Sequence, residues 1–117
     1  MNAAECMRLF VKFTGLADGT PYQHLVDGAI TEVSHLLLPD ADAEDARLNA
    51  YAAAIAHLHF VQFLAAKAEC APTYAGTAAQ QRDMQAICHA AETLAAEYRS
   101  AAADLLQDPH FVFTGVR

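Results

Sequence analysis

The segment formed by residues 48–66, LNAYAAAIAHLHFVQFLAA, is apolar on nearly every side of a helix. At about 100° per residue, its side chains divide between two opposite faces. One face carries Leu48, Tyr51, Ala52, Ile55, Leu58, His59 and Phe63. The other face carries Ala53, Ala54, His57, Phe60, Val61 and Leu64. A helix that is apolar on both faces has to be buried on both, so either the chain's other helices or another subunit must surround it.

The length of this run also raises the possibility of a membrane span. Four polar residues interrupt it: Asn49, His57, His59 and Gln62. Charged residues, including Arg47 and Lys67, flank it closely on both sides. This pattern favours a buried helix of a soluble protein over a transmembrane helix, and we expect no membrane association.

Size and charge limit the classes of function. A chain of 117 residues corresponds to a single domain, spanning residues 1–117, with room for a modest core. The formal net charge is −7, and the seven basic residues are scattered along the sequence. Because phosphate binding needs clustered Lys and Arg, specific binding of nucleic acid is not expected.

The cysteines indicate a reducing compartment. Cys6, Cys70 and Cys88 are odd in number and show no CxxC spacing, which argues against a disulfide framework. The N-terminal sequence MNAAECMRLF has neither the basic region nor the long apolar run of a signal peptide. We therefore expect an intracellular protein.

Helix start and stop signals predict an all-α fold, a small bundle of about four helices. The first helix covers residues 3–14 and stops at Gly15. In the second, Thr20, Pro21 and Gln23 form a capping box, and the helix ends before Pro39. The third follows the sequence DADAED and runs to about residue 69, between the other helices.

Asp40 or Asp42 is expected to cap this third helix, because acidic residues suit a helix N-terminus. The fourth helix begins near Thr77 and continues to the stop at Asp108 and Pro109, which would make it the longest. A short extended apolar tail with Phe111, Val112 and Phe113 follows it. Such a tail is too apolar for an ordinary frayed terminus and should pack on its own bundle or on a neighbouring subunit.

No motif in the sequence predicts catalysis or a cofactor. Glu32 and His35 match the Glu-x-x-His spacing of di-metal bundles, but they fall off the apolar stripe of their helix, as His89 and Glu92 do on theirs. His57 and His59 face nearly opposite ways and cannot share a metal. The acidic DADAED run lacks the glycine and the closing glutamate of a calcium loop. We expect no enzyme activity, no metal and no cofactor.

His59 and Gln62 allow two interpretations, since both fall on a predominantly apolar face. They are either buried polar groups with hydrogen-bond partners or polar contacts that fix the register between subunits. The first is the commoner arrangement in proteins.

The order of these segments resembles that of the small head–tail connector proteins (adaptor or head-completion proteins) of tailed bacteriophages and prophages. Three parts of the sequence carry the resemblance, which covers nearly the full length. They are AAECMRLFVKFTGL followed by TPYQHLVDGAITEVSHLL, the Ala-rich central helix, and TYAGTAAQQRD leading into a final helix that ends in ADLLQDPHFVFTG.

The resemblance implies a structural role without catalysis. Identical subunits would form a ring beneath the portal, extend the DNA channel and receive the tail, so the partners would be further copies, the portal and tail proteins. The protein would reside in the bacterial cytoplasm during assembly and then in the virion. The expected subunit interface comprises His57, Phe60, Val61, Leu64, Phe111, Val112 and Phe113.

The alternative function belongs to a different class. The chain could be a standalone cytoplasmic helical bundle that binds a small ligand or a partner protein. Subunit stoichiometry separates the two hypotheses, because a monomer with a closed core favours the standalone bundle and a self-assembling protein favours the connector.

Overall fold

The computed structural model describes the backbone of residues 1–70 and 77–107 and the side chains of residues 1–67 and 82–107. The helices are α1 (Ala3–Thr14), α2 (Gln23–Leu36), α3 (Ala46–Cys70) and α4 (Thr77–Ala101). Two short 3₁₀ helices, η1 (Thr20–Tyr22) and η2 (Ala103–Leu105), precede α2 and follow α4. Within these described ranges there is no strand, and one isolated bridge joins Leu37 to Leu106. The prediction of an all-α bundle is confirmed.

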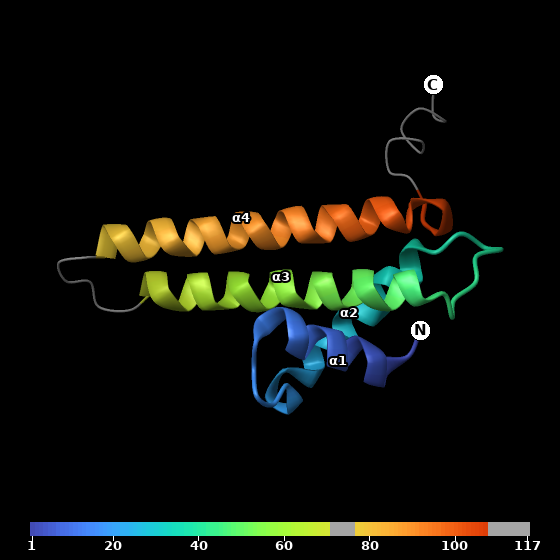
Figure 1. Ribbon diagram of the computed structural model, residues 1–117, viewed down its shortest axis with the longest axis horizontal. Coiled ribbons are helices and arrows are strands. Elements are labelled where there is room, and N and C mark those ends of the chain that lie inside the picture. Colours follow the sequence, from blue (N-terminus) through green and yellow to red (C-terminus); the bar gives the residue numbers. More distant parts are fainter. Residues whose placement is uncertain (71–76, 108–117) are drawn as a thin grey trace, which may run out of the picture.

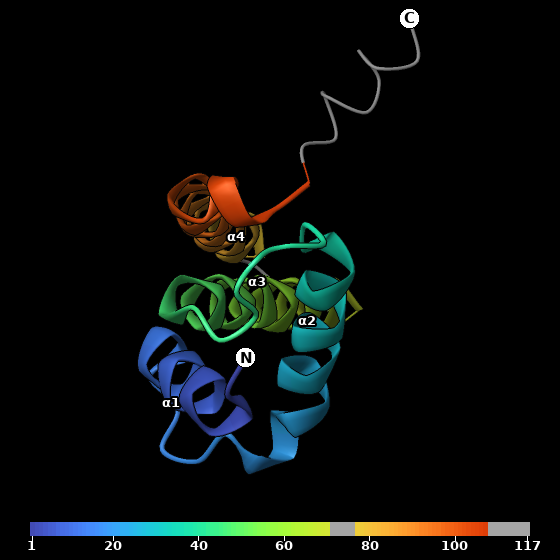
Figure 2. The same cartoon turned by 90° about the vertical axis from the view of Figure 1, so that its right-hand side faces the viewer.

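Helix α3 lies in the middle of the molecule. It forms a long antiparallel hairpin with α4, while α1 and α2 pack against its opposite side (Figure 1). Seen from the end, α4 lies on one side of α3, and α1 and α2 lie on the other (Figure 2). Helices α3 and α4 contain 25 residues each, so α4 is not the longer of the two. The predicted tail, with Phe111, Val112 and Phe113, lies outside the described residues.

Both faces of the first half of α3 are buried within the single chain. Leu48, Ala52, Ala53, Ala54 and Ala56 are completely inaccessible to solvent. The small alanine side chains let helices approach from several directions at once. The chain's own helices therefore satisfy the two-sided burial that the sequence requires, without a second subunit along this half.

An aromatic cluster fixes the helices on the α1 and α2 side. The Phe60 ring of α3 packs edge-on against Phe10 of α1, with centroids 5.9 Å apart, and against Tyr22 of η1, at 4.8 Å. Such edge-to-face pairs contribute about 0.5–1.5 kcal/mol beyond the area they bury. This cluster joins α1, the start of α2 and α3 into one core.

The N-terminal residues are held to α3 by Asn49, a polar side chain that the bundle buries. Its Oδ1 accepts a hydrogen bond from the backbone N–H of Asn2 at 3.0 Å, and the Cys6 thiol lies 3.6 Å away. Burial raises the pKa of the Cys6 thiol. A polar residue within the apolar run is thus tolerated because its oxygen has partners.

Helix α1 has the predicted limits. The side chain of Asn2 accepts hydrogen bonds from the N–H groups of Ala4 and Glu5, at 2.9 and 3.2 Å. At the other end Gly15 adopts φ +75°, and its N–H donates to the carbonyl of Val11 at 2.9 Å. Glycine is favoured here because a left-handed residue without Cβ closes a helix at little cost.

Two predicted caps are wrong. Thr20 does not cap α2, because Thr20 lies in η1 and both its N–H and its hydroxyl donate to the carboxylate of Asp18, which lowers the pKa of Asp18. Helix α3 is capped by Asp45, whose Oδ1 accepts from the N–H of Arg47 at 2.9 Å. Asp42 instead accepts from the N–H of Glu44, in the preceding turn.

The end of α4 also differs from the prediction. The helix stops at Ala101 and not near Asp108, because residues 105–107 turn away to pair with the end of α2. The N–H of Leu38 donates to the carbonyl of Leu105 at 3.0 Å, and the N–H of Gln107 donates to the carbonyl of Leu36 at 2.8 Å. These tertiary hydrogen bonds replace the backbone hydrogen bonds that a longer α4 would have made.

Part of α3 satisfies the length and composition of a membrane span. Residues Ala46–Lys67 are long and apolar enough to cross a membrane, and 56% of their most apolar 18-residue stretch is buried inside the protein. The core helix of a soluble bundle meets the same criteria, so the test by itself favours neither arrangement.

The buried Gly19 gives a test of this packing. A Cβ atom there would lie 2.6 Å from Sδ of Met7 and 2.8 Å from Cγ2 of Val11, so Gly19→Ala should destabilise the fold by about 1–3 kcal/mol. Gly28, exposed within α2, has no atom within 4 Å of that position, and Gly28→Ala should stabilise by about 0.5–1 kcal/mol. Chemical denaturation measures both variants, and equal effects would contradict this account.

Candidate functional site

The residues considered for metal binding do not come together. Glu32 and His35 are exposed on α2, and His89 and Glu92 are exposed on α4. Among the residues that the structure describes, no three His, Cys, Asp or Glu side chains are placed to hold a metal ion.

The predicted subunit interface divides into two groups. Phe60 and Val61 are only 6% and 4% exposed, and both belong to the chain's own core. Phe60 fills the aromatic cluster, and the carbonyl of Val61 lies 3.9 Å from the Cys88 thiol of α4. This places both residues inside one protomer, so a contact between subunits has to use other side chains.

His57 and Leu64 are half-buried on the same side of α3. The His57 ring lies 6.2 Å from the ring of Phe13, and its Nδ1 is buried with no hydrogen-bond partner among the described residues. Burial lowers the pKa of His57. The other two polar positions of the run are less enclosed, since His59 is half-buried and Gln62 is exposed. The prediction that both are buried polar groups is therefore wrong for Gln62.

The length of α3 explains why its second half is less covered. At about 1.5 Å per residue, α3 spans about 37 Å, whereas α1 and α2 span about 18 and 21 Å. The two short helices pack against the first part of α3, and the rest of the α3–α4 hairpin extends past them (Figure 1). We call residues 61–67 and 82–90 the free end of the hairpin.

The free end carries the two large hydrophobic side chains that are most exposed among the described residues. Phe63 of α3 is 53% exposed, and Ile87 of α4 is 45% exposed. The contact between Cys88 and Val61 sets the register of the hairpin, so Phe63 and Ile87 lie at similar heights along it. Phe63 follows Phe60 by about 300° around the helix, so it lies on the α1 and α2 side of α3, away from α4, whereas Ile87 is a separate exposed position on α4. The free end is the candidate functional site.

Sequence reasoning missed Phe63 and Ile87 as surface residues. Both fit the apolar stripes of their helices, and nothing in the local sequence distinguishes them from buried neighbours. The lengths of α1 and α2 could have predicted that part of α3 stays exposed on their side, since helices of 12 and 14 residues cannot cover one of 25 residues.

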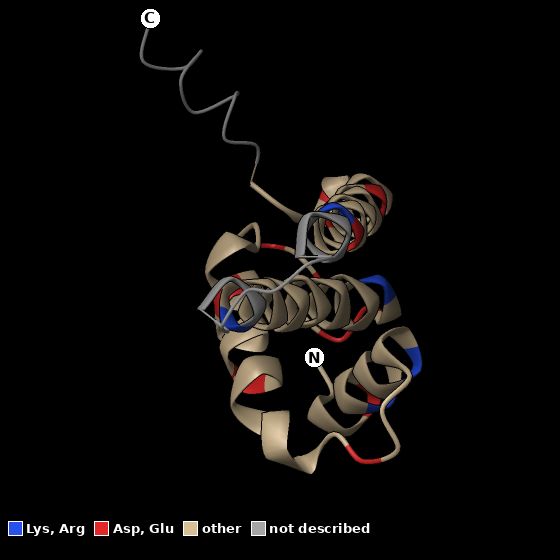
Figure 3. Ribbon diagram, turned by 90° about the vertical axis from the view of Figure 1, so that its left-hand side faces the viewer, with Lys and Arg blue, Asp and Glu red and all other residues tan. Residues whose placement is uncertain are grey.

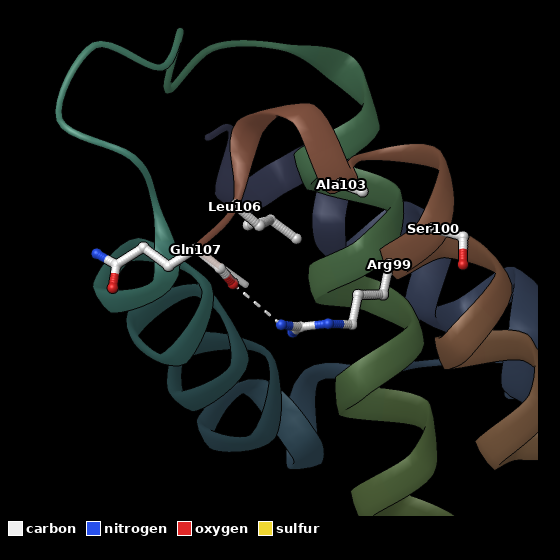
Figure 4. Close-up of a pocket in the computed structure, with 5 residues that line it drawn as sticks. All are labelled: Arg99, Ser100, Ala103, Leu106 and Gln107. Atoms are coloured by element: carbon white, nitrogen blue, oxygen red, sulfur yellow. Dashed lines mark hydrogen bonds between the residues drawn. The ribbon is translucent and has the colours of Figure 1, made fainter. Parts of the chain in front are cut away.

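A second feature lies at the opposite end of the hairpin. A shallow depression of about 250 Å³ is lined by Arg99, Ser100, Ala103, Leu106 and Gln107 (Figure 4). Arg99 extends across it, with one guanidinium nitrogen 3.2 Å from the carbonyl of Gln107 and the other 2.9 Å from the Tyr51 hydroxyl. The guanidinium thus holds residue 107 against α3 and α4.

Arg47 strengthens the same junction. Its guanidinium donates to both carboxylate oxygens of Asp104, at 2.8 and 3.2 Å, and to those of Asp45. The hydrogen bonds with Arg47 lower the pKa of Asp45. The start of α3, the end of α2 and residues 104–107 are thereby tied together. We call this junction the anchor, because it holds residues 104–107 against the ends of α2 and α3.

Charge gives no sign of a nucleic-acid site. Lys and Arg are dispersed over the described helices and are interspersed with Asp and Glu (Figure 3). No matching family model, curated protein or solved structure was found for this chain.

The buried Nδ1 of His57 predicts a pH dependence of stability. The folded protein lowers the pKa of this imidazole, so the unfolded chain binds a proton more readily. The stability contributed by neutral His57 is complete above the ordinary value of 6.5 and is lost as the pH falls from there toward the lowered pKa. In thermal unfolding, Tm should decrease as the pH is lowered from 7.5 to 5.5. His57→Gln should reduce this dependence of Tm on pH.

The exposed His35 provides the matched control, since His35→Gln should keep the wild-type slope. The carboxylates of Glu5, Asp18 and Asp45 have lowered pKa values and remain ionised over this range. A steep slope retained in the His57 variant would contradict the interpretation.

Proposed function

We propose that this chain is a structural assembly protein that binds further copies of itself, of the kind represented by small phage head–tail connectors. The observation that carries the proposal is the free end, where Phe63 and Ile87 stand exposed on an otherwise well-packed bundle. Burying a large apolar side chain contributes about 1.5–3 kcal/mol, and each of these residues is about half covered already. Contact with a neighbour would recover the remainder.

The closed first half of α3 on its own favours the standalone bundle, so the assembly proposal depends on the exposed side chains of the free end. Residues 51–56 are buried within one chain, so a protomer has a core of its own and does not need a partner in order to fold. Among the described residues, the exposed large apolar side chains, Phe63 and Ile87, lie at one end of the elongated hairpin. A ring built by head-to-tail contacts needs two different surfaces on each subunit, and under this proposal the free end supplies one of them.

The charge is compatible with the role of a channel wall. The formal net charge is −7, and the basic residues do not cluster. DNA passing through such a ring would meet few cations able to hold its phosphates. Under this proposal the further partners are the portal and tail proteins, the site of action is the bacterial cytoplasm and then the virion, and no catalysis is involved.

The alternative is a standalone cytoplasmic bundle that binds a small ligand or a partner protein. The depression beside Arg99 is where a ligand would be sought. Its volume of about 250 Å³ is below the range of about 300–1,000 Å³ that is usual for ligand pockets. The Arg99 guanidinium also already contacts Tyr51 and Gln107. These two facts favour assembly over ligand binding.

Self-association is the test of the proposal. Sedimentation velocity should detect concentration-dependent oligomers of the wild-type chain. Phe63→Ser should weaken association about tenfold, equivalent to about 1.4 kcal/mol, because it removes an exposed apolar contact. Because about half of Phe63 is covered, Phe63→Ser should also lower the unfolding free energy by about 1 kcal/mol.

Phe60 provides the matched comparison, since it lies one turn earlier and is buried. Phe60→Ala should lower the unfolding free energy by about 3–5 kcal/mol. A wild-type chain that remains monomeric up to about 1 mM, where association would be worth less than about 4 kcal/mol, would contradict the proposal.

A further inference from the structure

We propose that the C-terminal end of α1 with the residues that follow it, 13–16, is a pH-sensitive latch that opens from the α3–α4 hairpin when His57 takes up a proton. The proposal does not depend on the assembly function, because it concerns contacts within one protomer. It rests on the side chains that meet where α1 ends and on one buried polar atom of α3.

Phe13 joins α1 to both helices of the hairpin. Its ring centroid lies 6.2 Å from that of His57 on α3 and 5.6 Å from that of Tyr98 on α4. All three residues are half-buried. Phe13 therefore covers His57 on the α1 side, and this cover is lost if the end of α1 moves away.

The Nδ1 atom of His57 is buried and has no hydrogen-bond partner among the described residues. A neutral imidazole tolerates this state, because its unprotonated nitrogen is only an acceptor. The protonated ring carries N–H groups at both nitrogens, and a buried N–H of a cation without a partner is costly. The α3 residues one turn before and after, 53–54 and 60–61, are apolar and buried, so they offer no side-chain acceptor. Protonation at Nδ1 therefore requires water to enter.

The titratable and charged groups around His57 do not offset this cost. From α4, Tyr98 packs against Phe13, and Cys88 lies one turn further along the hairpin. From α1, Lys12 is exposed and has the same sign of charge as a protonated His57. Neither helix thus brings a carboxylate to the contact from these positions.

The acidic residues of this part of α4 lie on other sides of the helix. Glu92 and Glu97 are exposed, and they lie about 120° and 100° around α4 from Tyr98. Burial therefore lowers the pKa of His57 without an opposing attraction to a described carboxylate. Lowering the pH favours the conformation in which water reaches Nδ1.

The end of α1 is the part of the contact that can open at the lowest cost. None of residues 13–16 is fully buried, whereas Cys6 and Phe10 in the earlier turns are completely inaccessible to solvent. Phe10 also packs against Phe60, with ring centroids 5.9 Å apart. Because a local opening that breaks few buried contacts costs less than global unfolding, proton uptake by His57 releases this turn while the rest of the core stays closed.

Native-state hydrogen exchange of the full chain tests the proposal. The amides of residues 13–15 and of the buried residues 51–56 are followed by NMR at pH 7.5 and 5.5, in low concentrations of guanidinium chloride. Exchange of residues 13–15 should be insensitive to denaturant, as a local opening is, and their opening constant should rise several-fold at the lower pH. The ceiling is about tenfold, because an imidazole with the ordinary pKa of 6.5 is about ten-to-one protonated at pH 5.5 in the open state.

Three variants identify the group responsible. His57→Gln should remove the pH dependence of this opening, whereas His35→Gln, at an exposed position of α2, should keep it. Phe13→Ala, which uncovers His57, should bring the midpoint of the His57 NMR titration up toward 6.5.

Four results would overturn the proposal. Residues 13–15 exchange only together with residues 51–56, or their opening does not change with pH. The pH dependence persists in His57→Gln, or Phe13→Ala leaves the midpoint of the His57 titration unchanged.

Discussion

The burial of α3 on both faces is the constraint on which the rest of this structure depends. Its alanine-rich first half lets α1 and α2 approach one side and α4 the other without leaving space between backbones. Large side chains then come from the partners, with Phe10 and Tyr22 closing around Phe60. Without this shared central helix, α1 and α2 would have no apolar surface large enough to stabilise them, because most helix stability comes from tertiary packing.

The same constraint accounts for what the bundle leaves open. Two short helices can cover only about half of a helix twice their length, and the described residues form no further helix on that side of α3. The uncovered half stays folded because α4 runs alongside it, with Cys88 against the backbone of Val61. The exposure of Phe63, which lies on the α1 and α2 side of α3, is therefore a consequence of helix lengths.

The two ends of the protomer have complementary properties. At one end the guanidinium groups of Arg47 and Arg99 donate hydrogen bonds to Asp104 and to the carbonyl of Gln107, and backbone hydrogen bonds join residues 105–107 to the end of α2. At the other end, apolar side chains lack cover. Under the proposed assembly function, contacts between opposite ends of different copies would generate a ring or a filament.

The sequence by itself determined the helical class, the limits of α1 with its stop at Gly15, and the need to bury both faces of α3. These depend on local backbone preferences and on side-chain spacing within a few turns, which the order of residues contains directly. Only the tertiary structure decided which acid caps α3, where α4 ends, and that Phe60 is buried while Phe63 is exposed. Those outcomes depend on the positions and the ends of neighbouring helices. Long-range packing and the hydrogen bonds between residues 36–38 and 105–107 determine both.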